Sequence, residues 1–206
     1  LNLLLNEQPD KAIDALVEVA KLDPETTELH FALGSLFRRR GETERAIRVH
    51  QHLVGREDIA ARDRAHAGYE LGRDFLRAGM LDRAEASLNQ VGDGRYLIPA
   101  KVALLEMYQI EKDWRKAIIA ASELAQLEKK DYQDQIAQFD CEIALEAMRR
   151  QDLAASHLAL DHAFIAVPEH IRATILRGEV YILGQRPKEA ITTWKLIEEK
   201  YPAFLH

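Results

Sequence analysis

Small residues recur along this chain in pairs whose members lie 12 positions apart. The pairs are Gly34 with Ala46, Gly72 with Ala84, and Gly178 with Ala190. An aromatic residue stands three positions beyond each glycine, as Phe37, Phe75 and Tyr181. Small side chains let two helices approach closely, and a neighbouring ring fills the remaining space. The pattern therefore predicts a hairpin of two tightly packed helices that is repeated along the chain.

The second small residue of each pair marks the length of the repeat. The series runs Ala12, Ala46, Ala84, Ala117, Ser156 and Ala190, with intervals of 34, 38, 33, 39 and 34 residues. A period of 34 residues is that of the tetratricopeptide repeat. One hairpin cannot bury its apolar face alone, so successive hairpins must stack. We therefore expect an all-α fold, a tetratricopeptide-repeat right-handed α-solenoid of stacked antiparallel helix pairs.

The repeat predicts where units and helices begin and end. We expect residues 1–206 to form a single array, with a partial unit over 1–26 and units over 27–63, 64–97, 98–134, 135–169 and 170–206. First helices are expected near 27–39, 64–77, 98–110, 135–150 and 170–183. Second helices are expected near 9–21, 43–54, 81–90, 113–127, 152–165 and 187–200. Gly41 and Gly79 fall in the turns within hairpins, and helices are expected to close at Pro24, Pro168 and Pro202.

Composition and charge narrow the class of protein. With 47% apolar and 30% charged residues the chain can bury a core, and 10 Gly and 6 Pro in 206 residues favour helices over many turns. The net charge of −6 has the wrong sign for a general nucleic-acid binder. The single Cys141 excludes an intrachain disulfide and indicates a cytosolic protein. Because the chain begins with Leu1 and not Met, we expect it to be part of a longer protein.

Residue patterns typical of catalysis or metal binding are absent from the sequence. The spacings of His50 with His52 and of His157 with His162 place neither pair on one helical face. We expect His50 to be a satisfied core histidine and Cys141 to be an unreactive core or groove-lining thiol. We therefore expect no catalytic, cofactor-binding or metal-binding residues. An enzyme or metal protein with an unrecognised site is the alternative from a different class.

Arginines and aromatic residues gather at the N-terminal end of the expected groove. In this repeat the first helices line a concave surface, and the candidate partner-binding residues there are Phe31, Arg38, Arg39, Tyr69, Arg73 and Arg77. The next unit contributes Pro99, Val102, Glu106, Gln109 and Ile110. Guanidinium groups bind carboxylates, and rings add contact area, so we expect an acidic protein segment as the ligand. Alternatively, the run Arg38-Arg39-Arg40 is an ordinary basic helix terminus.

Several strings go beyond the general repeat pattern. They include Leu33-Gly34-Ser35-Leu36-Phe37-Arg38-Arg39-Arg40-Gly41-Glu42, Arg45-Ala46-Ile47-Arg48-Val49-His50-Gln51, Leu71-Gly72-Arg73-Asp74-Phe75, Ala78-Gly79-Met80-Leu81-Asp82-Arg83-Ala84-Glu85, Trp114-Arg115-Lys116-Ala117-Ile118 and Cys141-Glu142-Ile143-Ala144-Leu145. With these strings the chain resembles the central repeat region of the lipopolysaccharide assembly protein B family of Gram-negative bacteria. The likeness covers nearly the whole chain and is strongest through about residue 120.

The resemblance implies a non-enzymatic adaptor at the cytoplasmic side of the inner membrane. Members of that family have an N-terminal membrane anchor, a repeat array and a C-terminal rubredoxin-like zinc module. The cysteines of that module are absent here, so no cofactor is expected within this chain, and membrane contact is expected only through the anchor. The implied partners are the membrane protease FtsH and the lipid A deacetylase, whose degradation limits lipopolysaccharide synthesis. A generic peptide-binding chaperone or scaffold with another partner is the alternative.

Overall fold

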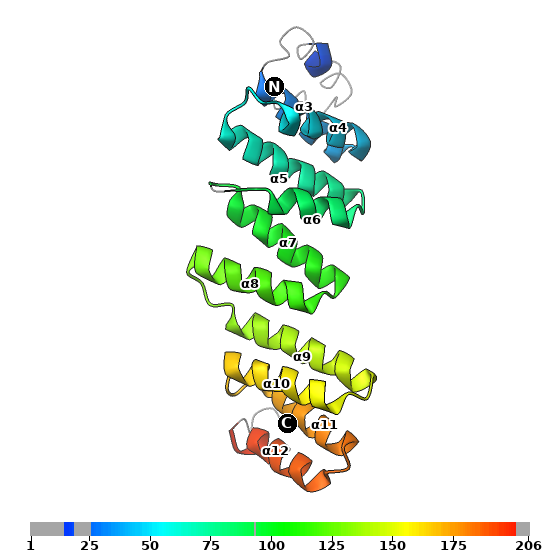
Figure 1. Ribbon diagram of the computed structural model, residues 1–206, viewed down its shortest axis with the longest axis vertical. Coiled ribbons are helices and arrows are strands. Elements are labelled where there is room, and N and C mark those ends of the chain that lie inside the picture. Colours follow the sequence, from blue (N-terminus) through cyan, green and yellow to red (C-terminus); the bar gives the residue numbers. More distant parts are fainter. Residues whose placement is uncertain (1–14, 19–25, 93, 201–206) are drawn as a thin grey trace. The chain divides into compact units, whose positions relative to one another are not determined.

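The computed structural model describes residues 15–18, 26–92 and 94–200, and all regular structure in these ranges is α-helical (Figure 1). The helices are α3 (Thr27–Arg39), α4 (Thr43–Gly55), α5 (Ala61–Arg77), α6 (Leu81–Asn89), α7 (Leu97–Glu111), α8 (Trp114–Glu128), α9 (Gln133–Arg149), α10 (Leu153–Ala166), α11 (Ile171–Leu183) and α12 (Pro187–Lys200). Each helix predicted between residues 27 and 200 is confirmed, with its ends within three residues of those expected. The predicted helix near 9–21 lies largely outside the described residues, as do Ala12, Pro24 and Pro202.

The glycines of the repeat lie on the first helix of a hairpin, where a large side chain from the second helix packs directly against the backbone. A Cβ atom on Gly72 would lie 2.6 Å from Leu88 Cδ2, and one on Gly34 would lie 2.4 Å from His50 Nε2. In each hairpin this large residue follows the buried small residue by four positions, that is, by one helical turn. The pair of small residues therefore allows the two helices to approach closely, and the large side chain one turn later fills the space between them.

Turns within the hairpins use a left-handed backbone. Gly41 and Gly79 have φ angles of 78° and 69°, as the sequence predicts for these positions. The corresponding turns farther along use non-glycine residues, namely Lys112, Gln151 and Gln185, with φ angles of 60°, 59° and 57°. A left-handed conformation costs a residue with a Cβ atom about 1–2 kcal/mol. The helix packing on either side of these turns must offset that cost.

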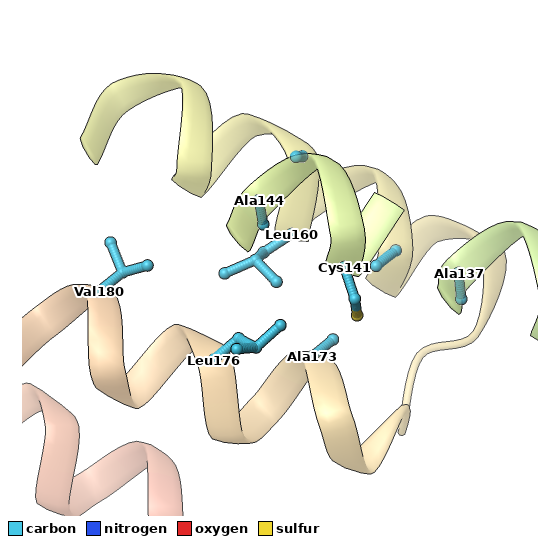
Figure 2. Close-up of a cluster of buried hydrophobic side chains, with 9 residues drawn as sticks. Ala137, Cys141, Ala144, Leu160, Ala173, Leu176 and Val180 are labelled. Atoms are coloured by element: carbon cyan, nitrogen blue, oxygen red, sulfur yellow. The ribbon is translucent and has the colours of Figure 1, made fainter. Parts of the chain in front are cut away.

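The chain comprises two compact units, Leu1–Met107 and Tyr108–His206, each with its own core. In the first unit, Leu33, Leu36, Phe37 and Ala46 form a buried cluster between α3 and α4. In the second unit, α9, α10 and α11 bring together Ala137, Cys141, Ala144, Ala159, Leu160, Ala163, Ala173, Leu176 and Val180 (Figure 2).

Cys141 belongs to this second core and is fully buried. Its Sγ atom lies 3.7 Å from Nδ1 of His170, a residue from the next hairpin. Burial nevertheless raises the pKa of the Cys141 thiol to about 12, so the thiolate is not formed near neutral pH. Of the two placements that the sequence left open, the core thiol is the one observed.

Candidate partner-binding groove

Three first helices of the first unit line a concave pocket of about 750 Å³, which we call the arginine pocket. Its lining residues are Arg38 and Arg39 of α3, Tyr69, Arg73, Leu76 and Arg77 of α5, and Ile98, Pro99, Val102, Ala103 and Glu106 of α7. Five of the six residues predicted for the N-terminal groove thus line one pocket, and Phe31 does not. Of the five groove positions predicted from the next unit, Pro99, Val102 and Glu106 line it as well, whereas Gln109 and Ile110 do not.

Arg39 and Arg77 are the cations of this pocket that are free to bind a ligand. Each lies in the last turn of its helix, where the helix dipole favours a positive charge. Both side chains are exposed. Within residues 26–92 and 94–200, the structure gives neither guanidinium group a hydrogen bond or an ion pair. Their donors therefore remain available for the carboxylates of a partner.

Arg73 of α5, a third cation of the arginine pocket, makes only two weak contacts within the protein. Its guanidinium carbon lies 5.6 Å from the centroid of the Tyr69 ring, and Nη1 lies 3.6 Å from Glu70 Oε1. The side chain is 46% exposed, so water screens both contacts and each contributes little to stability. Arg73 can exchange its contact with Glu70 for a contact with a ligand at small cost.

Arg38 lines the same pocket but uses its donors within the protein. Its Nη1 donates to Asp74 Oδ1 at 2.8 Å and to the backbone oxygen of Glu70 at 3.2 Å, and its Nη2 donates to the Glu70 carboxylate. Burial alone would lower the pKa of Arg38, but the attraction of Glu70 and Asp74 outweighs it and raises the pKa. Arg38 therefore fastens α3 to α5, and little of its charge is left for a ligand.

His50 completes this buried network from α4. Its Nδ1 lies 2.5 Å from Asp74 Oδ2, and both side chains are fully buried. The sequence interpretation of His50 as a core histidine is confirmed, and the expectation that it is satisfied holds for Nδ1 but not for Nε2. The Nε2 atom is buried without a hydrogen-bond partner, because the ring lies against Gly34, which offers no polar group there.

Phe31 lies in a neighbouring hollow of about 310 Å³ that it shares with His66 and Tyr96. The Phe31 and His66 rings are stacked with centroids 3.9 Å apart, and His66 stacks on Tyr96 at 4.3 Å. Burial lowers the pKa of His66, so the histidine in this stack is neutral near pH 7. The structure thus separates Phe31 from the arginines with which the sequence grouped it.

Comparison with known proteins places the repeat in a family. The sequence profile of the tetratricopeptide repeat matches residues 2–56 and 141–202, which together are more than half of the chain. The chain belongs to the tetratricopeptide repeat family. Two structures of such proteins share its fold. A tetratricopeptide repeat protein from Parabacteroides merdae has a TM-score of 0.52 and 12% sequence identity, and the match covers 97% of this chain and 76% of that one. YrrB, a protein with an unusual peptide-binding site, has a TM-score of 0.50 and 16% identity, and the match covers 92% of this chain and 94% of that one.

Curated relatives confirm the more specific resemblance. Lipopolysaccharide assembly protein B of Escherichia coli (strain K12) is 40% identical over 201 residues, which cover 97% of this chain and 52% of that protein. The Haemophilus influenzae protein of the same name is 28% identical over 213 residues, which cover 99% and 54%. The chain therefore spans about half the length of these relatives.

The tetratricopeptide fold is one that binds other proteins, and the arginine pocket is a candidate surface for such binding. In the described part of the chain no group of three or more His, Cys, Asp or Glu side chains is arranged to hold a metal ion. None of the described helices is long and apolar enough to cross a bilayer. What the arginine pocket offers is two free guanidinium groups, a third that is weakly held, and apolar side chains from α7 beside them.

Proposed function

We propose that this chain is the protein-binding array of a non-enzymatic adaptor that regulates lipopolysaccharide synthesis. In this proposal the adaptor presents the lipid A deacetylase to the membrane protease FtsH, from the cytoplasmic side of the inner membrane. The identity of 40% to lipopolysaccharide assembly protein B supports the pathway. The free arginines of the arginine pocket support a mechanism of binding and positioning.

The arginine pocket determines what kind of segment would be bound. Arg39 and Arg77 attract carboxylates, and Ile98, Pro99 and Val102 offer an apolar surface for a side chain between them. Glu106 lines the same pocket and repels an acidic residue placed next to it. The ligand we expect is therefore a segment that carries both acidic and apolar residues.

Long-range and short-range electrostatics oppose each other at this pocket. The chain has a net charge of −6, which repels an acidic partner at a distance. At physiological salt, charges more than about 8 Å apart are largely screened, so the arginines decide the interaction at contact. Binding should therefore weaken as salt is raised, and association should be slow compared with electrostatically steered pairs.

Crosslinking in cells tests the identity of the partner. A photoreactive phenylalanine analogue at Tyr69 in the full-length protein would sample whatever occupies the arginine pocket, and the same analogue at the exposed Arg48 of α4 serves as the control. We expect the deacetylase to be attached from position 69 and not from position 48. Attachment of an unrelated protein from position 69 would contradict the proposal and favour a generic peptide-binding scaffold.

A further inference from the structure

The second unit contains a hollow of about 510 Å³ that the groove does not involve. It lies where α9 packs between α8 and α10, and we call it the aspartate hollow. Its lining residues are Arg115, Ile118 and Ser122 of α8, Gln133, Ile136, Asp140, Ile143 and Ala147 of α9 with Arg150 just after it, and Ala155, Leu158, Ala159, His162, Ile165 and Ala166 of α10. Small side chains make up about a third of this lining and leave the space open.

Asp140 is the unusual member of this set. It is only 5% exposed, yet in the described part of the chain its carboxyl group makes no hydrogen bond or ion pair. The buried Asp74 of the first unit, in contrast, is bonded to both Arg38 and His50. The carboxylate is removed from most of its water without a hydrogen bond in exchange, and this burial raises the pKa of Asp140 to about 6, which attraction by His162 only partly offsets.

The side chains around Asp140 are mainly apolar. Ile136 and Ile143 of α9 are half-buried, whereas Leu158 and Ile165 of α10 are 57% and 80% exposed. Large exposed apolar side chains beside a concave site are typical of an interaction surface. A small amine could neutralise Asp140 but would leave the apolar side chains of Leu158 and Ile165 exposed to water. The surface therefore fits a segment of another protein better than a small molecule.

We propose that the aspartate hollow binds a protein segment that inserts one lysine or arginine side chain between apolar neighbours. The charged head pairs with Asp140, and the methylene stem lies against Ile136 and Ile143. Arg115 and Arg150 also line the hollow, are exposed and disfavour a second cation, so the segment is not polybasic. This site prefers the opposite charge to that preferred by the arginine pocket and does not depend on the function proposed for it.

Matched peptides test this charge preference on the purified chain. The probes are amphipathic helical peptides of about 15 residues, with leucine and alanine on one face and glutamine and serine on the other, that differ only at one central position of the apolar face, which is lysine, norleucine or glutamate. Fluorescence anisotropy of labelled peptides gives the affinity of each. We expect the lysine peptide to bind about fivefold or more tightly than the norleucine peptide and the glutamate peptide to bind most weakly.

Two variants assign that preference to one carboxylate. Asp140→Asn should bind lysine and norleucine peptides equally, whereas Asp134→Asn, which removes the same charge from an exposed position of the same helix, should keep the preference. Circular dichroism verifies that both variants are folded. A lysine preference that persists in Asp140→Asn would overturn the proposal, as would equal binding of the three peptides to the parent chain or failure of all three to bind at about 1 mM.

Discussion

Replacement of Asp140 by asparagine should stabilise the protein near neutral pH. The asparagine is uncharged at every pH and nearly the same size, so the change removes the charge and keeps the packing. In the folded chain the pKa of Asp140 is raised from its ordinary value of 3.8 to about 6. The folded state therefore favours the protonated carboxyl group more strongly than the unfolded state does.

The size of the effect follows from this shift. Each unit of pKa difference corresponds to about 1.4 kcal/mol, so a shift of about two units costs the folded state at most about 3 kcal/mol once the group is ionised. Because Asp140 borders an open hollow, water can approach and reduce this cost, and we expect about 1–3 kcal/mol. The folded state binds more protons than the unfolded state between pH 3.8 and about 6, so the contribution of Asp140 to stability falls as pH rises through that window.

Urea unfolding of the two proteins at a series of pH values measures this contribution. The difference in unfolding free energy between Asp140→Asn and the parent should rise between pH 4 and 6 and level off above about pH 7. Subtraction removes groups that titrate in the same way in both proteins. His162 also lines the hollow, so its replacement by glutamine in both backgrounds is the control. A difference that is flat with pH, or that favours aspartate at pH 7, would refute the reasoning.

Three further outcomes follow from the packing and the ion pairs. Ala84→Leu should lower the stability of the fold by about 1–3 kcal/mol, because it overpacks a fully buried site, and should lower the melting temperature accordingly. Ala86→Leu, at an exposed site of the same helix, should leave the melting temperature almost unchanged. Arg38→Met should lower the free energy of unfolding by about 3 kcal/mol, because the buried carboxylates of Asp74 and Glu70 lose their ion pairs with Arg38. Arg39→Met should leave urea unfolding unchanged. Treatment of the purified chain with a chelator should not alter its circular dichroism or its melting temperature, and unfolding under these conditions would indicate a structural metal.

The helices could be predicted from sequence because their cause is local and periodic. Small residues at Gly72 and Ala84 permit close helix packing wherever they recur, so their spacing gives the hairpins and the turns between them. The turns at Lys112, Gln151 and Gln185 lack the glycine that marks the earlier ones. There the helix pattern on either side identified the turn, although the turn residue itself did not.

The site was predicted less completely, because charge pairing depends on contacts between distant parts of the chain. Sequence placed Arg38 and Arg39 together, but the structure gives Arg38 two buried carboxylate partners 32 and 36 residues away and gives Arg39 none within the described ranges. A carboxylate at Asp74, two residues beyond the close-packed Gly72, was the available signal that this face of α5 carries a buried ion pair. Nothing in the sequence around Asp140 indicated that it is buried without a hydrogen-bond partner among the described residues.

The rate at which cells degrade the lipid A deacetylase tests the proposed function most directly. In the full-length protein, Arg39→Glu combined with Arg77→Glu reverses the charge of the two free arginines, and Arg48→Glu with Lys195→Glu makes the same charge change at exposed sites outside the arginine pocket. Exposed charges contribute little to folding, so both variants should remain folded. We predict that the deacetylase half-life lengthens severalfold with the first variant and is unchanged with the second. An unchanged half-life in cells with the first variant would contradict the account.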